Sequence, residues 1–375
     1  MSTRSLRVAV IGASGRGDYG HGLDTAFLDV PGTELVAVAD HDPAGAARAA
    51  RRVGVSRDYR DYRQMLATER PDIVCVGPRW LTQRVEMVEA AAAAGCHVYC
   101  EKPFAPDLVS ADRMLAACRT AKTKLALAHQ WRAMPPIRQA IADVAAGKYG
   151  RLLRATARPK DDHRGGGEEL LVHGTHWFDL IIALAGLPRW VSGHVQVGHR
   201  DATRRDRTDG TEPVGPLTGD SISAMFGFPR GVRGYFESTA GLSIRGRSKF
   251  DNLYGVSLEC ERAAIHFRQP GDAWVYPAPR VLPDLKHLVW KRLTVAGWHT
   301  DKAGRPRNVR KTWIRDGNRV LAIDLVDAIR KDRAPLSGPT HALAITEMVQ
   351  GVYASHFAEG RRLPIPLETR GHPLQ

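Results

Sequence analysis

The first 130 residues alternate between short apolar runs and longer segments whose apolar residues recur at helical spacing. The apolar runs have the length of buried strands. They cover residues 8–11, 34–40, 72–76, 96–99 and 125–128. The longer segments predict helices over residues 43–53, 59–69, 81–94 and 107–121. Strands that alternate with helices of roughly 10 to 15 residues indicate βαβ units, and therefore a doubly wound parallel sheet.

The pattern changes near His129, where we place the end of the first domain. The remaining residues predict longer strands, including two hairpins, and therefore an open antiparallel or mixed sheet. The hairpins are expected over residues 221–238 and 256–267, and helices over residues 135–146, 171–185, 319–331 and 341–359. The stretch Pro277–Arg310 gives mixed signals and is assigned to no element. The chain is thus expected to be an α/β protein of two domains, residues 1–129 and 130–375.

The first apolar run is followed at once by a glycine-rich turn, Gly12-Ala13-Ser14-Gly15-Arg16-Gly17. A strand, such a turn and a following helix form the unit that holds the pyrophosphate of a dinucleotide, because glycines let the phosphates approach backbone N–H groups. The turn departs from the strict G-x-G-x-x-G pattern, since Ser14 stands at its second glycine position. Serine is small, and its hydroxyl can donate to a phosphate oxygen. An ordinary glycine-rich turn after a strand is the alternative interpretation.

The second apolar run ends in Asp40, which lies 23 residues beyond Gly17. A Rossmann unit places the carboxylate that binds the adenosine ribose at about this distance. An acid there accepts hydrogen bonds from both ribose hydroxyls and repels a 2′-phosphate, which favours NAD over NADP. Arg48, Arg51 and Arg52 follow in the next predicted helix. They keep NADP binding open, unless they form the solvated face of that helix.

Composition and charge narrow the class of protein. The chain of 375 residues carries a formal net charge of +14, but its arginines are spread out and no nucleic-acid-binding signature accompanies them. We therefore expect an arginine-rich surface and no nucleic-acid partner. No apolar run approaches the roughly 20 residues of a membrane span, and the first strand begins too early to leave room for a signal peptide. The five cysteines form no C-x-x-C pair, so reduced, mostly buried thiols and a cytoplasmic location are expected.

The run at residues 96–99 leads into Glu101-Lys102-Pro103. Ligands bind at the carboxyl ends of strands in open α/β sheets. A lysine at such an end, beside a nicotinamide, can donate to a substrate oxygen and stabilise developing charge. The alternative is a solvated loop lysine, which the strand-end position and the rigid proline disfavour.

On these motifs, and on the glycine-rich loop that leads to Gly174-Thr175-His176-Trp177-Phe178-Asp179, the chain resembles the Gfo/Idh/MocA family of NAD(P)-dependent oxidoreductases over nearly its whole length. The resemblance implies a Rossmann domain followed by an α/β domain whose open sheet mediates homo-oligomerisation. It also implies nicotinamide chemistry on a sugar, a polyol or a related carbonyl compound. By this resemblance Lys102 is the catalytic lysine and His176 the catalytic histidine.

The resemblance also supplies the expected cofactor contacts. NAD is the expected cofactor, with NADP as the alternative. The residues expected to bind it are Gly12, Ala13, Ser14, Gly15, Arg16, Gly17, Asp40, Pro78, Arg79, Glu101 and Lys102.

The chain departs from the family pattern near both proposed catalytic residues. The family commonly shows D-x-G-x-H, but Val172 stands at the aspartate position. The local candidates for a replacement are His173, Glu168, Glu169 and Asp179. The family's Pro-Asn segment is here Pro78-Arg79-Trp80, and a histidine commonly seen there is Thr82. A positive Arg79 near the nicotinamide would suit an acidic substrate.

Glu169, His173 and His176 are also residue types that bind zinc. Their spacing matches no standard zinc signature and nothing else in the chain completes a site, so we expect no metal.

We therefore predict an NAD(P)-dependent dehydrogenase that transfers a hydride between nicotinamide and a secondary alcohol or its ketone. Two alternatives stay open. One is a redox-neutral glycosidase that keeps NAD tightly bound, and the other is a non-catalytic nucleotide-sensing regulator on the same fold.

Overall fold

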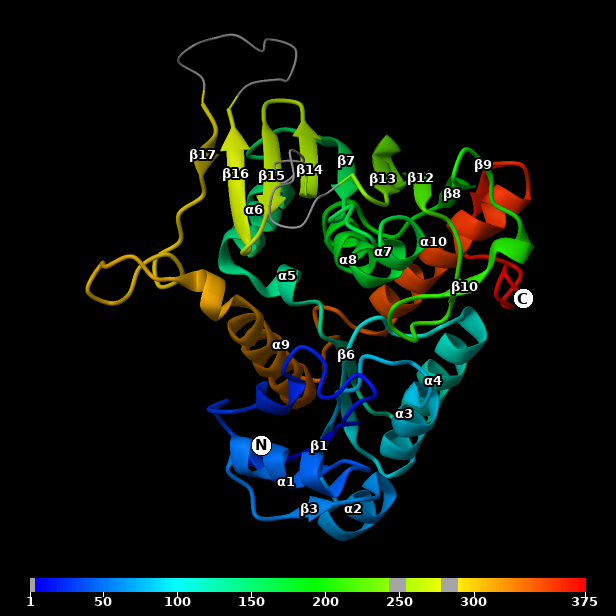
Figure 1. Cartoon of the computed structure of the whole chain (residues 1–375). Coiled ribbons are helices and arrows are strands. Elements are labelled where there is room, and N and C mark those ends of the chain that lie inside the picture. The colour runs from blue at the N-terminus through cyan, green and yellow to red at the C-terminus, as the bar shows by residue number, and fades with distance from the viewer. Residues whose placement is uncertain (1–3, 243–253, 278–288) are drawn as a thin grey trace. The chain divides into compact units, whose positions relative to one another are not determined.

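The computed structural model describes residues 4–242, 254–277 and 289–375, which fold into two compact units (Figure 1). The first unit comprises Met1–Gln130, Glu212–Gly215 and Ile314–Thr346, and the second comprises Trp131–Thr211, Pro216–Trp313 and Glu347–Gln375. The first unit thus draws on segments from the end of the chain. Residues 278–288 of the unassigned stretch Pro277–Arg310 lie outside the described residues, as do residues 1–3 before the first strand.

A six-stranded parallel sheet forms the centre of the first unit, in the order β3-β2-β1-β4-β5-β6. Its strands are β1 (Leu6–Ile11), β2 (Thr33–Ala39), β3 (Asp58–Tyr59), β4 (Ile73–Val76), β5 (His97–Cys100) and β6 (Leu125–Leu127). This order is that of a Rossmann sheet, in which the direction of winding reverses between β1 and β4. Ligands bind outside the carboxyl ends of strands at such a reversal. The predicted doubly wound parallel sheet is confirmed.

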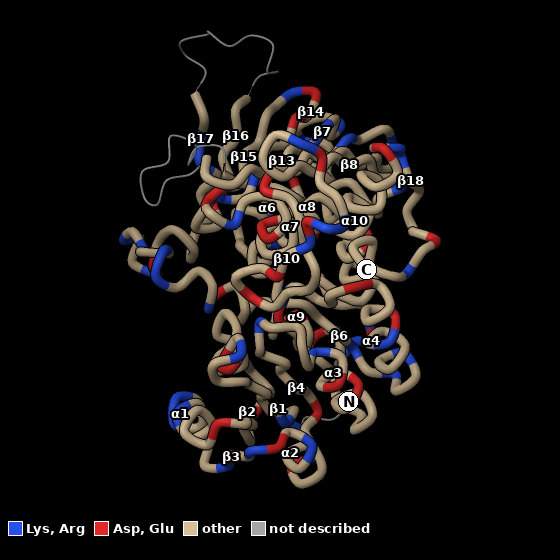
Figure 2. Tube along the Cα trace, turned by 45° about the vertical axis from the view of Figure 1, so that its right-hand side comes forward, with Lys and Arg blue, Asp and Glu red and all other residues tan. Residues whose placement is uncertain are grey.

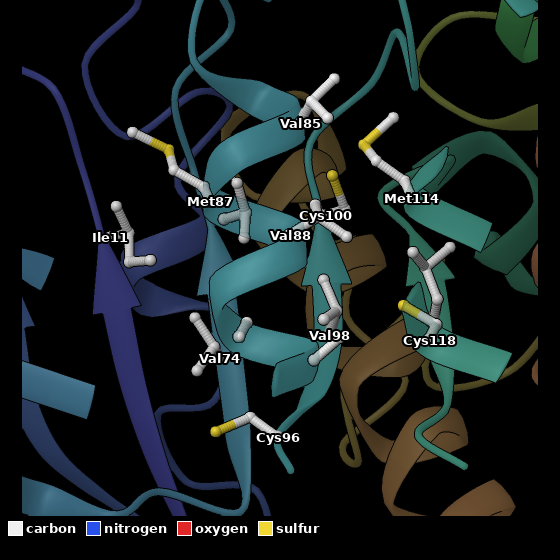
Figure 3. Packing of buried hydrophobic residues seen from close by; sticks show 14 of the residues in the cluster. Ile11, Val74, Val85, Met87, Val88, Cys96, Val98, Cys100, Met114 and Cys118 are labelled. Atoms are coloured by element: carbon white, nitrogen blue, oxygen red, sulfur yellow. The ribbon is translucent and has the colours of Figure 1, made fainter. Parts of the chain in front are cut away.

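The helices of this unit are α1 (Pro43–Val53), α2 (Tyr62–Glu69), α3 (Arg84–Ala93), α4 (Leu108–Thr120) and α9 (Trp313–Arg330), together with the start of α10 (Pro339–Phe357). Aspartate side chains cap three of them: Asp42 accepts from backbone N–H groups at the start of α1, Asp61 at α2 and Asp107 at α4. Between α3, α4 and the central strands lies a continuous apolar cluster, in which Val74, Val98 and Met114 are fully buried (Figure 3). The strands are apolar on both faces because helices cover both faces of a parallel sheet.

No α-helix follows the glycine turn, so the expected strand–turn–helix unit is wrong in its last part. The chain after Gly17 runs through turns, with only a short 3-10 helix at Leu23–Thr25. Gly20 and Gly22 have φ angles of 59° and 80°, which a helix cannot accommodate. Four closely spaced glycines with positive φ angles, Gly15, Gly17, Gly20 and Gly22, therefore favour turns over a helix here.

The second unit is built on a ten-stranded mixed sheet in the order β17-β16-β15-β14-β7-β13-β12-β8-β18, with β9 paired to β8. The strands are β7 (Leu152–Arg158), β8 (Trp190–Val197), β9 (Arg200–Asp201), β12 (Ser221–Gly227), β13 (Arg233–Thr239), β14 (Gly255–Cys260), β15 (Ala264–Arg268), β16 (Asp272–Tyr276), β17 (Lys291–Arg292) and β18 (Leu363–Pro364). A separate short pair joins β10 (Thr208–Asp209) to β11 (Pro216–Leu217). Both predicted hairpins, β12–β13 and β14–β15, are present. Among the described strands of this sheet, β7 and β13 pair in parallel and the other pairs are antiparallel, so the sheet is mixed, as expected.

Helices α5 (Gln130–Ala133), α6 (Pro135–Ala145), α7 (Gly167–Val172) and α8 (Gly174–Ala185) follow the first unit along the chain (Figure 1). α8 packs on β7 and α6 on β16. The single helix expected over residues 171–185 is in fact two, α7 and α8, which meet at His173. Gly174 lies at that junction, where a Cβ would come within 3.2 Å of the Phe236 ring.

Lys and Arg positions are interspersed with Asp and Glu positions along the traces of both units (Figure 2). Across the described ranges, no helix combines the length and apolar character needed to cross a membrane. All five cysteines are buried and none forms a disulfide.

Candidate functional site

The glycine turn forms a closed loop at the carboxyl end of β1. The backbone N–H and C=O groups of Ala13 and Asp18 bond to each other, and the N–H of Gly15 donates to the Asp18 carboxylate at 2.9 Å. A Cβ on Gly17 would come within 2.5 Å of the backbone nitrogen of Arg79. A Cβ on Gly12 would come within 2.3 Å of the Tyr19 ring. The glycines are therefore required by close approach of this protein's own chain, in addition to any phosphate.

Asp40 follows β2 directly and is 2% exposed. Its carboxylate accepts from the backbone N–H of Ser14 at 3.0 Å and from the Ser14 hydroxyl at 2.8 Å. The expected ribose-binding acid therefore lies against the glycine turn, and Ser14 links the two strand ends. Burial, and next the charge of Asp40, raise the pKa of the Tyr19 phenol, so that Tyr19 stays neutral beside the carboxylate.

A cavity of about 190 Å³ opens at the ends of β1 and β2. Gly12, Ala13 and Asp40 line it on one side. Arg60 and Tyr62, which the sequence did not single out, line it as well. An acceptor carboxylate, a glycine turn and a cavity at the switch point fit the adenosine half of a dinucleotide.

The arginines that kept NADP open do not line this cavity. Arg48 pairs with Asp42 at 3.4 Å, and Arg52 pairs with Asp24 at 2.5 Å. Arg51 is exposed on α1. These contacts support the alternative interpretation, in which the three arginines form a face of α1 that contacts solvent or acidic residues of the same unit.

Arg79, in the loop after β4, is joined to an acidic partner. Its Nη1 lies 3.4 Å from Glu212 Oε1, and the next residues dock as well, since the Leu81 N–H donates to the Pro213 carbonyl at 2.9 Å. Glu212 offsets the positive charge that was expected to suit an acidic substrate. No sequence motif indicates this pairing, because Arg79 and Glu212 lie far apart in the chain.

Glu101 and Lys102 follow β5 and are buried, with exposed fractions of 0% and 4%. The Glu101 carboxylate forms an ion pair with His21. Burial disfavours the charged carboxylate, but the charges of His21, Lys102 and Arg84 outweigh it and hold the pKa of Glu101 below its ordinary value. Lys102 is thus a buried lysine at a strand end, in contrast to the solvated loop lysine of the alternative interpretation.

Arg84 braces the two loops that carry these residues, a role that the sequence did not reveal. It is fully buried at the start of α3. Its guanidinium donates to the carbonyl oxygens of Pro78, Glu101 and Pro103, the last at 2.8 Å. The loop after β4 and the loop after β5 are therefore held by one side chain.

His176 lies on α8 in the second unit, 6% exposed, and its ring centroid is 6.5 Å from that of His173. The candidate replacements for the family aspartate have different partners. Glu168 accepts from the backbone N–H and the hydroxyl of Thr211, and Asp179 pairs with Arg132 at 3.2 Å. Glu169 pairs with His173 at 2.6 Å.

The predicted site residues thus divide between the units. The turn, Asp40, Pro78, Arg79, Glu101 and Lys102 belong to the first unit, and His176 belongs to the second. Within the first unit the structure brings the turn together with Asp40 and with the loop of Arg79. Among the described residues, no group of three or more histidine, cysteine or acidic side chains could hold a metal ion.

Comparisons with known proteins agree with this geometry. Residues 6–129 match the oxidoreductase family with an NAD-binding Rossmann fold, Gfo/Idh/MocA. D-apiose dehydrogenase of Paraburkholderia graminis is 37% identical over 132 residues, which are 34% of this chain and 35% of that protein. D-glucoside 3-dehydrogenase of Escherichia coli is 27% identical over 264 residues, or 66% of this chain and 74% of that protein. The chain therefore matches only about a third of the length of the first of these relatives.

A solved structure of levoglucosan dehydrogenase in complex with NADH and L-sorbose superposes with a TM-score of 0.74. It is 20% identical and covers 96% of this chain and 99% of that one, so it shows a common fold. The family match, the strand order and the strand-end motifs agree that residues 6–129 form an NAD-binding Rossmann domain of the kind found in the Gfo/Idh/MocA oxidoreductase family.

Proposed function

We propose that the protein is an NAD-dependent dehydrogenase that oxidises a secondary alcohol of a sugar or polyol, or reduces the corresponding ketone. The observation that carries this proposal is Lys102, which is buried at the end of a Rossmann strand and directly follows Glu101, whose carbonyl oxygen accepts a hydrogen bond from Arg84. The two relatives named above, a D-apiose dehydrogenase and a D-glucoside 3-dehydrogenase, support a sugar as the substrate class.

The residues of the first unit fit a bound dinucleotide. Asp40 offers an acceptor at the cavity, and the glycine turn presents backbone where side chains would intrude. A carboxylate that binds the adenosine ribose repels a 2′-phosphate, so we propose NAD as the preferred form and Asp40 as the residue that discriminates against NADP. When bound, the nicotinamide supplies the hydride acceptor of the reaction.

The chain's own residues position the alcohol and move its proton. Lys102 donates a hydrogen bond to the substrate oxygen and stabilises the charge that develops on it. His176 accepts the proton of the reacting hydroxyl. These two roles follow the family resemblance.

The test is NADH formation with a panel of D-glucosides, levoglucosan, D-apiose, D-xylose and myo-inositol. We expect at least one of them to reduce NAD in the parent protein. Lys102→Met and His176→Asn should each lose about 10²- to 10⁴-fold in turnover while NAD binding is kept, because a proton-transfer group contributes about that factor. If both variants turn over at the parent rate, the assignment of the two residues is wrong.

We propose that the protein acts in the cytoplasm.

We also propose that it forms a homo-oligomer through one sheet face of the second unit. That face carries Ser192, Ser223 and Tyr235. Light scattering of the purified protein, beside a variant with Tyr235→Lys, tests the oligomer. A monomeric parent protein would refute it.

A further inference from the structure

Glu169 and His173 form a buried acid–imidazole pair in the second unit. Glu169 lies in α7 and is 0% exposed, and its Oε2 lies 2.6 Å from His173 Nδ1. The pair spans four residues, and His173 sits where α7 ends and α8 begins. A carboxylate this close to an imidazole nitrogen attracts the positive charge that the ring acquires when it takes up a proton.

The surroundings fix the carboxylate in place. Arg164 Nη2 lies 3.4 Å from Glu169 Oε1, and the backbone N–H of Lys160 donates to Glu169 Oε2 at 3.3 Å. Burial opposes the charged form, but His173 first, and then Arg164 and Lys160, hold the pKa of Glu169 below its ordinary value. Glu169 is therefore ionised at neutral pH although it is buried.

Aromatic side chains enclose the imidazole. The Tyr254 ring meets His173 edge-on at 5.9 Å between centroids, and Trp177 lies at 6.5 Å. Burial, and next the charge of Glu169, raise the pKa of Tyr254, so that its phenol adds no second negative charge. The titratable and charged groups that face the pair are Lys160, Asp161, Asp162, Arg164, Tyr254 and His176.

We propose that the Glu169–His173 pair takes over the task of the carboxylate that Val172 replaces, and that it holds the proton released in the reaction. This inference rests on the proposed dehydrogenase function. When the alcohol is oxidised, its O–H bond breaks and the proton passes to the histidines, while its C–H bond gives the hydride to NAD. His176 takes the proton first and passes it to His173, whose ring centroid lies 6.5 Å away and where the Glu169 carboxylate stabilises the imidazolium. Reduction of the ketone returns the same proton and the same hydride.

Two other nearby carboxylates have partners of their own. Glu168 accepts hydrogen bonds from Thr211, and Asp179 forms an ion pair with Arg132. His173 lies one position beyond Val172 and one helical turn beyond Glu169, so the pair flanks the family's aspartate position in the sequence. Glu169 is a positioning residue in this scheme, because it acts through His173.

Glu169→Gln tests the pair, with Glu168→Gln as the matched control. Both changes remove one buried negative charge from the same helix and keep the shape of the side chain. With NAD and the sugar that the parent protein oxidises, Glu169→Gln should lose about 10²-fold in kcat with little change in KM. The acidic limb of its pH–rate profile should move to lower pH, because His173 gives up its proton more readily without the carboxylate. Glu168→Gln should keep the position of that limb.

Two further variants separate a chemical role from a structural one. Adding Val172→Asp to Glu169→Gln should raise kcat at least tenfold above that of Glu169→Gln alone, because the second change restores a carboxylate at the family's aspartate position. His173→Gln should lose as much as Glu169→Gln, and the double variant should lose no more than either alone, since the two residues act as one unit. Two results would overturn the proposal. One is a loss of kcat in the double variant that equals the product of the two single losses, and the other is an acidic limb that stays at the same pH in Glu169→Gln.

An NMR titration needs no substrate and so separates this inference from the proposed function. In protein with labelled histidines, the His173 ring, assigned by its loss in His173→Gln, should remain protonated to a higher pH in the parent than in Glu169→Gln by about one unit or more. If the parent protein turns over no sugar, the proposed function is refuted, but the NMR titration of His173 can still be measured. Equal titration of His173 in both proteins would refute the pair.

Discussion

Removing the Arg84 guanidinium should loosen the loops that carry Lys102 and Arg79. Arg84→Met keeps much of the buried volume but leaves three backbone carbonyl oxygens without their charged donor. A hydrogen bond to a charged group contributes about 1.5–3 kcal/mol, and relief from burying the guanidinium offsets part of the loss. We therefore expect a net destabilisation of about 3 kcal/mol. For a folding unit of 150–250 residues this corresponds to a fall in Tm of about 6–12 °C.

Calorimetric unfolding of the full chain measures this effect, and NAD titration at a temperature below both transitions measures the effect on the site. Arg113→Met is the matched control, because Arg113 pairs with Glu89 at 2.9 Å on the surface with about half of its side chain exposed. A surface pair of this kind contributes about 0–1 kcal/mol. Arg84→Met should also weaken turnover, since Lys102 loses its fixed position. If Arg84→Met and Arg113→Met both unfold at the same temperature as the parent protein, Arg84 does not hold the two loops in place.

Three other changes test separate parts of the structure. Asp40→Asn should weaken NAD binding by about 10- to 100-fold in calorimetry and NADP binding far less, and an unchanged preference would refute the role of Asp40. Gly12→Val should abolish NAD binding and also lower Tm, because its side chain meets the Tyr19 ring; adding Tyr19→Ala should recover Tm but not NAD binding. The pKa of Asp162 is lowered to about 2, chiefly by Arg164 acting against burial, so this carboxylate stabilises the fold above its unfolded-state pKa of 3.8. In urea unfolding, Asp162→Asn should be less stable than the parent protein at neutral pH, and the gap should close as the pH falls from about 4 to about 2; a constant gap would contradict this reasoning.

The sheet of the first unit was predictable because its strands are short apolar runs separated by helices with clear caps. The pattern predicted β1, β2, β4, β5 and β6, while the two-residue β3 carries no such signal. The helix after the glycine turn was predicted wrongly, because the motif suggested it while Gly20 and Gly22 locally favour left-handed turns. The break between α7 and α8 was also missed, since the apolar pattern continues through Gly174.

The site was predictable where a residue's neighbours in sequence define its position. Lys102 and Asp40 lie at strand ends, and strand ends can be read from the apolar pattern. Their partners could not be predicted in this way. Arg84, His21 and Glu212 reach the site through tertiary contacts, and their sequence surroundings give no periodic signal.

Following NADH and the oxidised product together, while the protein acts on each sugar of the panel, tests the dehydrogenase proposal most directly. We expect NADH and ketone in equal amounts with at least one sugar, and loss of both in Lys102→Met. Conversion of a glycoside without net NADH would instead identify a redox-neutral enzyme. NAD binding without conversion of any sugar would contradict the account and favour a nucleotide-sensing protein.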